Sequence, residues 1–401
     1  MLRRFAAPIA LVFGLLLVGA VPASAMDAKT LSAALAKRTA TFGSRSGALV
    51  RDLTTGKTLF ERRRTLGLSP ASNEKLYTTA AAILRWGPDT RFTTTLRAAP
   101  GAGPDEKGVL DGDVVLVGAG DPSLNDDALR NLAADLRKAG VTRITGDILG
   151  DGRRFDTRRG SYASGWDPDP ELGGWLGGLT WGHGRTGGFG PAQVAASRLR
   201  FILKTKGVKV VGGAHNGYAR GVTRRIAAVA SPPMRTLITT TNVPSDNFYA
   251  ETLAKALGAS FGGAGTTTAG TQVIRTTLAR FGIHPRILDG SGLSARDNTS
   301  PAQIVTLLAE MARNANGLIW RASLPQPGVS GTLAERMKGT VAVTRCRAKT
   351  GTLHDVSALS GYCKVPGGHL LAFSFLSNGI DPLRVKSIEN QMVPMIASYE
   401  P

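Results

Sequence analysis

Cysteine, histidine and aromatic residues are scarce in this chain of 401 residues, and each shortage argues against a class of function. The two cysteines and five histidines are scattered, without the close spacing that metal ligands show. A zinc site or a Ser-His-Asp triad therefore has little support, and we expect neither a metal nor an organic cofactor. Aromatic residues make up 6% of the chain, and no basic-aromatic repeat occurs, so nucleic acid is not an expected partner.

Long apolar runs are also missing after the first 25 residues, so no later segment predicts a membrane span. The N-terminus combines an arginine pair, an apolar run over residues 9–21 and the triplet Ala23-Ser24-Ala25. This order predicts a secretory signal peptide over residues 1–25. An uncleaved membrane anchor is the alternative, which the shortness of the run disfavours. We therefore expect an exported protein that is periplasmic, cell-wall-associated or extracellular.

Acidic residues are the minority charge, with 29 Asp and Glu against 49 Lys and Arg, for a formal net charge of +20. Such an excess favours anionic surroundings, and for an exported protein these are lipid headgroups or anionic cell-wall polymers. A solvated basic surface with no partner explains the charge equally well.

Short strands are predicted near both ends of the chain. Residues 47–63 contain two β-rich runs joined by a Thr-Thr-Gly-Lys turn, and three further runs cover residues 341–353, 357–365 and 369–379. With helices predicted over residues 31–43 and 382–399, these strands can form one antiparallel five-stranded sheet flanked by helices, an α+β fold.

The middle of the chain differs from both ends. From about residue 91 to 231, short β-rich runs alternate with helices, which predicts an inserted smaller α/β domain. Within it, residues 173–190 contain nine glycines in 18 residues and predict a loop. The expected organisation is a signal peptide (1–25), a main domain (26–90 and 232–401) and an inserted domain (91–231).

Ser72 and Lys75 lie three residues apart at the start of a predicted apolar helix, in the segment SPASNEKLYTTAAAIL. Residues at this spacing share one helix face, so the hydroxyl and the amine are expected within hydrogen-bonding distance. A serine is a poor nucleophile without a base, and a lysine becomes one when burial or neighbouring cations lower its pKa. Lys75 is therefore the candidate general base for a nucleophilic Ser72.

Two further motifs follow in the chain. The segment PSDN contains Ser245 and Asn247, and the segment RAKTGTL contains the triplet Lys349-Thr350-Gly351. Each motif alone is common. In this order, however, the three match the motif set of penicillin-binding proteins and class A β-lactamases.

The second and third motifs supply the other groups that acyl transfer needs. Ser245 can relay a proton between Lys75 and the leaving group, while Asn247 can hold the substrate amide and help to fix Lys75. Lys349 adds positive potential, and the hydroxyls of Thr350 and Thr352 can bind a carboxylate. Gly351 completes the triplet on the predicted strand.

The backbone amides of Ser72 and Thr352 are candidate oxyanion donors. Each candidate also has an ordinary structural explanation. Ser72 and Ser245 would be helix N-caps, Lys75 a surface lysine with a buried stem, and Lys349 a strand charge. The coexistence of the three motifs favours the functional interpretation.

The only two cysteines, Cys346 and Cys363, flank the segment RAKTGTLHDVSALSGY symmetrically. If the two strands form a hairpin that turns between His354 and Asp355, the cysteines face each other within reach of a disulfide. The alternative, a pair of buried free thiols, is disfavoured outside the cytoplasm.

Beyond the motifs, the chain resembles the class C low-molecular-mass penicillin-binding proteins, that is, the penicillin-binding protein 4 family of D-alanyl-D-alanine carboxypeptidase/endopeptidases. Segments such as VGAGDPSL, GDILGDGRRFD and LDGSGLSARDNTSPAQIVTLL carry the likeness, which extends from about residue 30 to the C-terminus. The resemblance implies a β-lactamase/transpeptidase-like domain interrupted after the Ser72 helix by an inserted domain. It also implies that the active serine is acylated by peptidoglycan peptides ending in D-Ala-D-Ala or by β-lactams.

The sequence departs from this family in the inserted region. The spacing from Ser72 to Ser245 is short and the Gly-rich stretch is unusual, so we expect a shortened inserted domain. Asp151 is a candidate to hold the free amine of a stem-peptide diamino acid, although a turn aspartate explains it as well. Two other functions stay open: a serine β-lactamase, and a wall-binding protein with a decayed active site.

Overall fold

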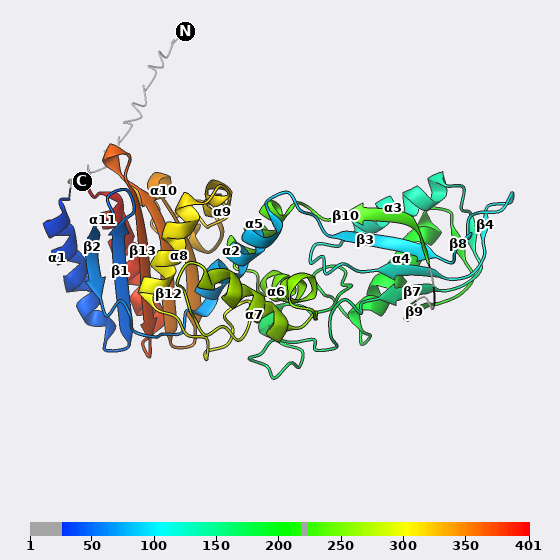
Figure 1. The fold of residues 1–401 in the computed structure, drawn as a ribbon, viewed down its shortest axis with the longest axis horizontal. Coiled ribbons are helices and arrows are strands. Elements are labelled where there is room, and N and C mark those ends of the chain that lie inside the picture. Colours follow the sequence, from blue (N-terminus) through cyan, green and yellow to red (C-terminus); the bar gives the residue numbers. More distant parts are fainter. Residues whose placement is uncertain (1–25, 219–220, 222) are drawn as a thin grey trace, which may run out of the picture.

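The computed structural model describes residues 26–218, 221 and 223–401 (Figure 1). The predicted signal peptide, residues 1–25, lies outside the described residues. Among the residues that are described, none of the helices combines the length and apolar character that crossing a bilayer requires.

Five antiparallel strands from both ends of the chain form the first sheet, as the sequence predicts. In spatial order they are β11 (Cys346–Leu353), β12 (Val356–Lys364), β13 (Leu370–Asn378), β1 (Ser46–Asp52) and β2 (Thr58–Arg62). The β11–β12 hairpin turns at His354 and Asp355, which pairs Cys346 with Cys363, and a disulfide joins the two. The predicted disulfide is therefore confirmed.

Helices cover both faces of this sheet because its strands bury apolar side chains on both sides. On one face, α1 (Ala28–Thr39) and α11 (Pro382–Ala397) pack against Val50 and Phe373. On the other, α2 (Glu74–Trp86) and α8 (Pro301–Arg313) pack against Leu49 and Leu376. The second face is the one that carries the Ser72 helix.

The remaining helices of this part of the molecule extend the second layer or connect the strands. They are α5 (Met234–Asn242), α6 (Asn247–Phe261), α7 (Thr267–Ala279), α9 (Gly317–Ala322) and α10 (Ala342–Arg345). Short 3-10 helices occur at η1 (Ala40–Phe42), η2 (Ala71–Asn73), η3 (Pro170–Leu172), η4 (Gly331–Leu333) and η5 (Pro366–Gly368).

The structure differs from the predicted strand over residues 341–353, because helix α10 precedes β11. Ala342 is fully buried in the core that α11 shares with the sheet, and Arg345 Nη1 donates to the Ala397 carbonyl at 2.8 Å. The β-branched residues around Ala342 favour a strand by propensity, but these tertiary contacts override that preference.

A second, mixed sheet lies at the other end of the molecule (Figure 1). Its strands, in spatial order, are β10 (Arg224–Ala230), β3 (Thr93–Ala98), β5 (Val114–Val117), β7 (Ile148–Asp151) and β9 (Ala214–Asn216). Three short parallel strands, β4 (Val109–Leu110), β6 (Arg143–Ile144) and β8 (Lys209–Val210), form a third sheet beside it.

The chain enters and leaves this region on neighbouring strands, because Thr93 of β3 pairs with Ala230 of β10. The strands of the second and third sheets all lie between these two residues, and they share a core with α3 (Asp126–Lys138) and α4 (Pro191–Thr205). Such a path is what an insertion into a host domain requires. The boundaries 91–231 themselves stay a prediction.

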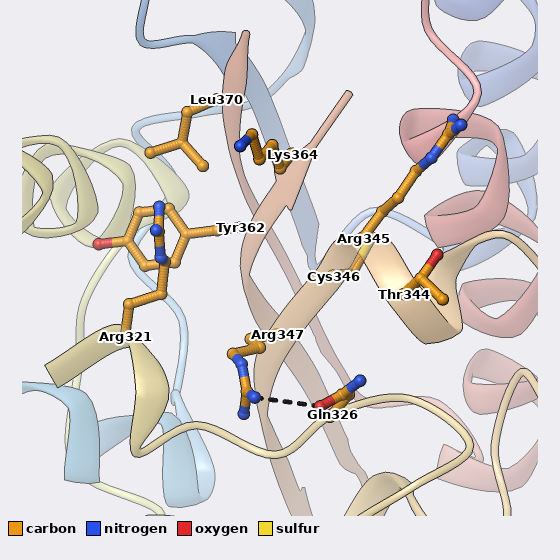
Figure 2. A pocket seen from close by; sticks show the side chains of 9 residues that line it. All are labelled: Arg321, Gln326, Thr344, Arg345, Cys346, Arg347, Tyr362, Lys364 and Leu370. Atoms are coloured by element: carbon orange, nitrogen blue, oxygen red, sulfur yellow. Dashed lines mark hydrogen bonds between the residues drawn. The ribbon is translucent and has the colours of Figure 1, made fainter. Parts of the chain in front are cut away.

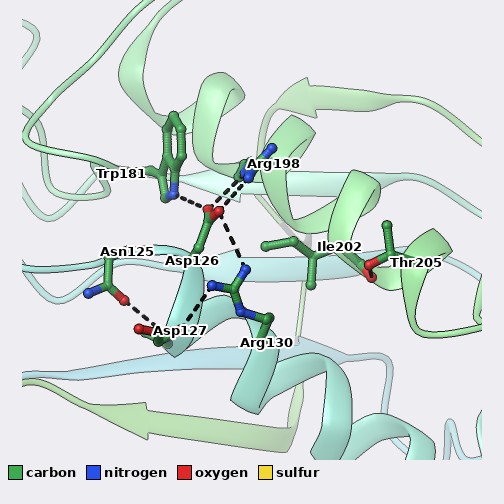
Figure 3. A network of polar contacts seen from close by, with 9 residues as sticks. Asn125, Asp126, Asp127, Arg130, Trp181, Arg198, Ile202 and Thr205 are labelled. Atoms are coloured by element: carbon green, nitrogen blue, oxygen red, sulfur yellow. Dashed lines mark hydrogen bonds and ion pairs between the residues drawn. The ribbon is translucent and has the colours of Figure 1, made fainter.

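A polar network ties the Gly-rich segment to these two helices (Figure 3). Asp126, in the first turn of α3, accepts hydrogen bonds from Trp181 Nε1 at 2.9 Å and from the guanidinium of Arg198 on α4. Arg130 approaches the same carboxylate from one turn along α3. As predicted, residues 173–190 contain no helix or strand, and Trp181 anchors them to the inserted region.

Candidate active site

Ser72 lies in η2, the 3-10 turn that leads directly into α2. Two asparagines fix this turn: Asn378 of β13 exchanges two hydrogen bonds with the backbone of Ser69, and Asn73 Nδ2 donates to the Lys349 carbonyl at 3.2 Å. Ala71 has a φ of 45°, in the left-handed region that non-glycine residues rarely occupy. Strained backbone of this kind persists only where the surroundings hold it, and it is concentrated at functional sites.

Lys75 is fully buried, and its amine donates three hydrogen bonds. Its Nζ lies 3.0 Å from Ser72 Oγ, 2.6 Å from Asn247 Oδ1 and 2.7 Å from the carbonyl oxygen of Ser291. The predicted approach of Ser72 and Lys75 on one helix face is therefore present.

Burial lowers the pKa of Lys75 from its ordinary 10.5 to about 8, and nearby carboxyl groups oppose a larger fall. The largest opposing effect comes from Asp289, followed by Glu251. An amine with a pKa near neutrality can both accept and return a proton during a reaction.

Ser245 and Asn247 lie between α5 and the first turn of α6. Ser245 has a φ of 65°, a second strained position in the site. Asp246, between them, caps α6 by accepting a hydrogen bond from the Tyr249 amide at 2.8 Å. Asn247 contacts Lys75 through Oδ1, while its Nδ2 donates to the Glu171 carbonyl at 2.7 Å.

Lys349, on β11, is fully buried, and its Nζ donates to Ser245 Oγ at 2.8 Å and to the Thr350 carbonyl at 2.9 Å. Burial, reinforced by the charge of Lys75, holds the pKa of Lys349 well below its ordinary value. Gly351 is required because a Cβ there would lie 2.6 Å from the Pro70 carbonyl oxygen. The strand can thus pass directly against the turn that carries Ser72.

A cavity of about 550 Å³ opens beside Ser72. Its lining residues are Ser72, Ala163, Ser164, Asp169, Glu171, Asn247, Leu293, Thr352, Leu353 and His354. The nucleophile candidate, the amide-holding Asn247 and Thr352 therefore share one space. Asp169 and Glu171 give the wall contributed by the inserted region an acidic character.

Asp151 is not brought to this space. Its carboxylate makes a two-pronged contact with the guanidinium of Arg153, at 3.0 and 2.8 Å, and it lines a different cavity with Arg153 and Tyr218. Asp169 and Glu171 are the carboxylates that line the Ser72 cavity.

The Thr350 hydroxyl forms a hydrogen bond with the Thr332 hydroxyl at 2.7 Å, and Thr350 does not line the Ser72 cavity. In the described residues, no group of three or more His, Cys, Asp or Glu side chains is arranged to hold a metal ion.

None of the candidate site residues named from the sequence lies in the loop that receives Lys75. Asp289 accepts hydrogen bonds from the amides of Ser291, Gly292 and Ser294, so it is a turn residue, but the turn presents the Ser291 carbonyl to Lys75. Glu251 Oε1 accepts from the Gly290 and Ser291 amides at 2.8 and 2.9 Å.

A sequence signal for Glu251 did exist. It follows Asn247 by four residues on α6, which places both side chains on the same helix face.

His183 was also missed, because it sits in the Gly-rich segment without any ligand-like spacing. Its Nε2 lies 2.8 Å from Asp246 Oδ2 and its Nδ1 lies 3.2 Å from the Gly173 carbonyl oxygen. The ring also packs against Phe248, with 4.5 Å between ring centroids. The hydrogen bond to Asp246 raises the pKa of His183. The segment thus closes over the second motif, which no local pattern indicates.

Comparison with known proteins gives a sequence match to the D-Ala-D-Ala carboxypeptidase 3 (S13) family over residues 27–174 and 188–399. The unmatched residues 175–187 fall within the Gly-rich segment. A D-alanyl-D-alanine carboxypeptidase of Actinomadura sp. (strain R39) is 30% identical over 89% of this chain and 82% of that protein.

Solved structures show the same fold. Penicillin binding protein 4 from Haemophilus influenzae superposes with a TM-score of 0.78 at 21% identity, covering 91% of this chain and 99% of that one. A predatory peptidoglycan endopeptidase from Bdellovibrio bacteriovorus gives a TM-score of 0.55 at 16% identity, covering 87% and 90%. The predicted α+β, β-lactamase/transpeptidase-like fold with an antiparallel five-stranded sheet is confirmed.

Proposed function

The chain belongs to the D-Ala-D-Ala carboxypeptidase 3 (S13) family and is a serine-type D-Ala-D-Ala carboxypeptidase, and we propose that its reaction passes through an acyl-enzyme on Ser72. The observation that carries this proposal is the contact between Lys75 Nζ and Ser72 Oγ, at 3.0 Å, in a setting that lowers the pKa of Lys75 to about 8. The substrates are peptidoglycan stem peptides that end in D-Ala-D-Ala.

In the first step, uncharged Lys75 takes the proton of the Ser72 hydroxyl as Oγ attacks the carbonyl carbon of the scissile amide. The backbone amides of Ser72 and Thr352 stabilise the oxyanion that forms. Ser245, whose Oγ accepts a hydrogen bond from Lys349 Nζ at 2.8 Å, relays the proton from Lys75 to the departing amine of the terminal D-Ala. The C–N bond then breaks and leaves an ester on Ser72, which water hydrolyses with Lys75 again as the base.

Lys349 recognises the terminal carboxylate, together with Thr352. The pKa of Lys349 lies well below its ordinary value in the free site because no carboxyl group in the described part of the chain offsets burial and the charge of Lys75. An arriving carboxylate supplies the missing negative charge, so substrate binding favours the protonated amine. Asn247 orients the substrate amide, and the Asp169 and Glu171 wall suits a positively charged group on the stem peptide.

β-Lactams acylate the same serine in this proposal, because their strained amide and carboxylate present the features that Ser72 and Lys349 act on. The Haemophilus influenzae relative has a solved complex with a β-lactam, with a TM-score of 0.74 to this chain. Endopeptidases among the structural neighbours support action on cross-linking peptides as well.

Export by the N-terminal signal peptide, and an inserted domain over residues 91–231, belong to the same proposal. So does association with anionic cell-wall polymers, for which the net charge of +20 is the support.

Intact-mass spectrometry of the mature protein with benzylpenicillin tests the proposal. A single adduct on the wild type that is absent from Ser72→Ala supports Ser72 as the acylated nucleophile. A folded wild type with no adduct and no drug consumed contradicts it. Drug consumed without a lasting adduct indicates a serine β-lactamase instead.

A further inference from the structure

Another cavity, of about 170 Å³, lies beside the disulfide and is lined by several positively charged side chains (Figure 2). It is lined by Arg321, Gln326, Thr344, Arg345, Cys346, Arg347, Tyr362, Lys364 and Leu370. No Asp or Glu is among the lining residues, and none of the four cations forms an ion pair with a carboxylate in the part of the chain that the structure describes.

Three of the four cations lie on one side of the sheet. Arg347 pairs with Tyr362 across β11 and β12, and Lys364 follows Tyr362 by two residues, so these side chains share a sheet face. Arg321, at the end of α9, lies over the Tyr362 ring, with its guanidinium carbon 5.9 Å from the centroid. Figure 2 shows Arg345 pointing the opposite way, toward α11. We call Arg321, Arg347 and Lys364 the cationic pocket.

The guanidinium of Arg347 is held in place by neutral acceptors. Its Nη1 donates to the carbonyls of Ala322 and Leu324 at 3.3 and 3.1 Å, and its Nη2 donates to Gln326 Oε1 at 3.0 Å. These bonds orient the group without cancelling its charge. The Nε–H and the second Nη2–H remain without an acceptor in the described residues, and such a pair of donors suits two oxygens of one phosphate or carboxylate group.

The cationic pocket is separate from the active site. The two cavities share no lining residue. Between Arg347 and Lys349, the Ala348 amide donates to the Pro325 carbonyl at 2.9 Å, so the segment around Pro325 lies against the outer edge of β11 at this point. A ligand can therefore occupy the pocket without touching Ser72.

We propose that the cationic pocket binds the phosphodiester group of a polyanion, with glycerol phosphate as the shared chemistry of the wall polymers and lipid headgroups that could supply it. Two guanidinium groups and an amine offer more donors than the two oxygens of a carboxylate can accept, and a phosphodiester adds two ester oxygens to its two charged oxygens. The cationic pocket would be the site at which the wall-polymer binding proposed above takes place. Binding there does not depend on the acylation of Ser72.

Calorimetric titration of the mature protein with glycerophosphoglycerol, a soluble phosphodiester, tests the proposal. The variant R321Q/K364Q removes two charges from the pocket, and we expect it to weaken binding about tenfold or more, since charged hydrogen bonds dominate phosphate recognition. The matched control K37Q/K57Q removes two charges from exposed lysines outside the pocket and should change the dissociation constant less than about twofold.

No saturable binding by the wild type, or equal weakening in both variants, overturns the proposal. Repeating the titration with soluble poly(glycerol phosphate), and with phosphatidylglycerol against phosphatidylcholine vesicles, identifies the source of the phosphate group. Both variants should still form the benzylpenicillin adduct, so a failure of the pocket is distinguishable from a failure of the Ser72 mechanism.

Discussion

Lys75 and Lys349 are both fully buried in one site, but the regions around them differ in charge. Around Lys75, carboxyl groups from α2, α6 and the loop at Asp289 offset burial, and the pKa stays at about 8. Around Lys349, no carboxyl group of the described residues opposes the effect of burial, and the charge of Lys75 adds to that effect. The same side chain is thus placed in two different electrostatic environments by its neighbours.

This difference assigns different tasks to the two amines. Lys75 can exchange a proton near neutral pH, as a general base must. Lys349 has a lowered pKa that a bound anion would raise again, so it can couple recognition of the substrate carboxylate to the charge of the site. Variants of the two lysines and of their neighbours test this division of tasks.

Removing each amine in turn gives the largest expected effect. Lys75→Met should slow acylation by benzylpenicillin about 10³-fold or more, within the range for loss of a positioned general base. Lys349→Met should slow it less, about tenfold to a hundredfold, mainly through weaker binding of the carboxylate. Stopped-flow measurement of the acylation rate constant against drug concentration separates the two effects. A larger loss in Lys349→Met would reverse the assignment of the base.

The disulfide stabilises the position of Lys349 and not that of Lys75, since it closes the hairpin that carries Lys349. Replacing Cys346 and Cys363 by alanine should lower the free energy of unfolding by about 3 kcal/mol, the scale for a bridge between residues 17 apart in sequence. Urea unfolding measures the loss, and dithiothreitol should reproduce it in the wild type without affecting the variant. We expect a rise in KM for D-Ala-D-Ala peptides, while the Lys75-dependent pH profile is retained.

Local patterns made much of this site predictable. The Ser72–Lys75 contact follows from helix periodicity, and the disulfide follows from the symmetry of the hairpin around His354 and Asp355. The five-stranded sheet follows from alternation and turn residues in short segments. The order of the three motifs indicated the chemistry before any distance was known.

What the sequence could not provide are contacts between distant segments with no pattern of their own. The Ser291 carbonyl meets Lys75 across 216 positions of the chain, and His183 meets Asp246 across 63. Neither contact corresponds to a periodicity or a residue spacing in the sequence from which it could be predicted. The helix at Ala342 is a case in which a local pattern misled the prediction. The segment has strand propensity, but it is helical where it packs against α11.

Glu251 tests whether the buried carboxyl groups around Lys75 lower the stability of the folded protein. Burial raises the pKa of Glu251 from an ordinary 4.5 to about 8, so the folded protein keeps a proton that the unfolded chain releases above pH 4.5. The free energy of unfolding should therefore fall as the pH rises from 4.5 to about 8. In Glu251→Gln this fall should be shallower by on the order of 2 kcal/mol.

Urea unfolding of the wild type and Glu251→Gln across this pH range measures the slope directly. Glu310→Gln, at a surface ion pair on α8, controls for the change of side chain itself. The glutamine side chain in Glu251→Gln would still offer an oxygen to the Gly290 and Ser291 amides, so a loss of the Lys75-dependent rate is not expected. An unchanged slope would show that Glu251 ionises as easily in the folded protein as in the unfolded chain.

The smallest change in stability is expected from His183, which bonds Asp246. Asp246 is one of the acids that raise the pKa of Lys75. Both ring nitrogens of His183 face acceptors, Asp246 and the Gly173 carbonyl, an arrangement that favours the doubly protonated ring. The raised pKa of His183 means that its stabilising contribution is complete below its ordinary 6.5 and is lost as the pH rises through the higher folded value.

His183→Gln should therefore lower stability at about pH 5.5 and leave it nearly unchanged at about pH 8.5. The effect is small because the His183 side chain is 37% exposed and water screens the pair. His215→Gln is the matched control, since His215 is 58% exposed and stands 3.9 Å from Asp147 outside the active site. Equal losses at both pH values would mean that His183 acts by packing against Phe248, and that the Gly-rich segment closes over Asp246 without a charge-dependent contact.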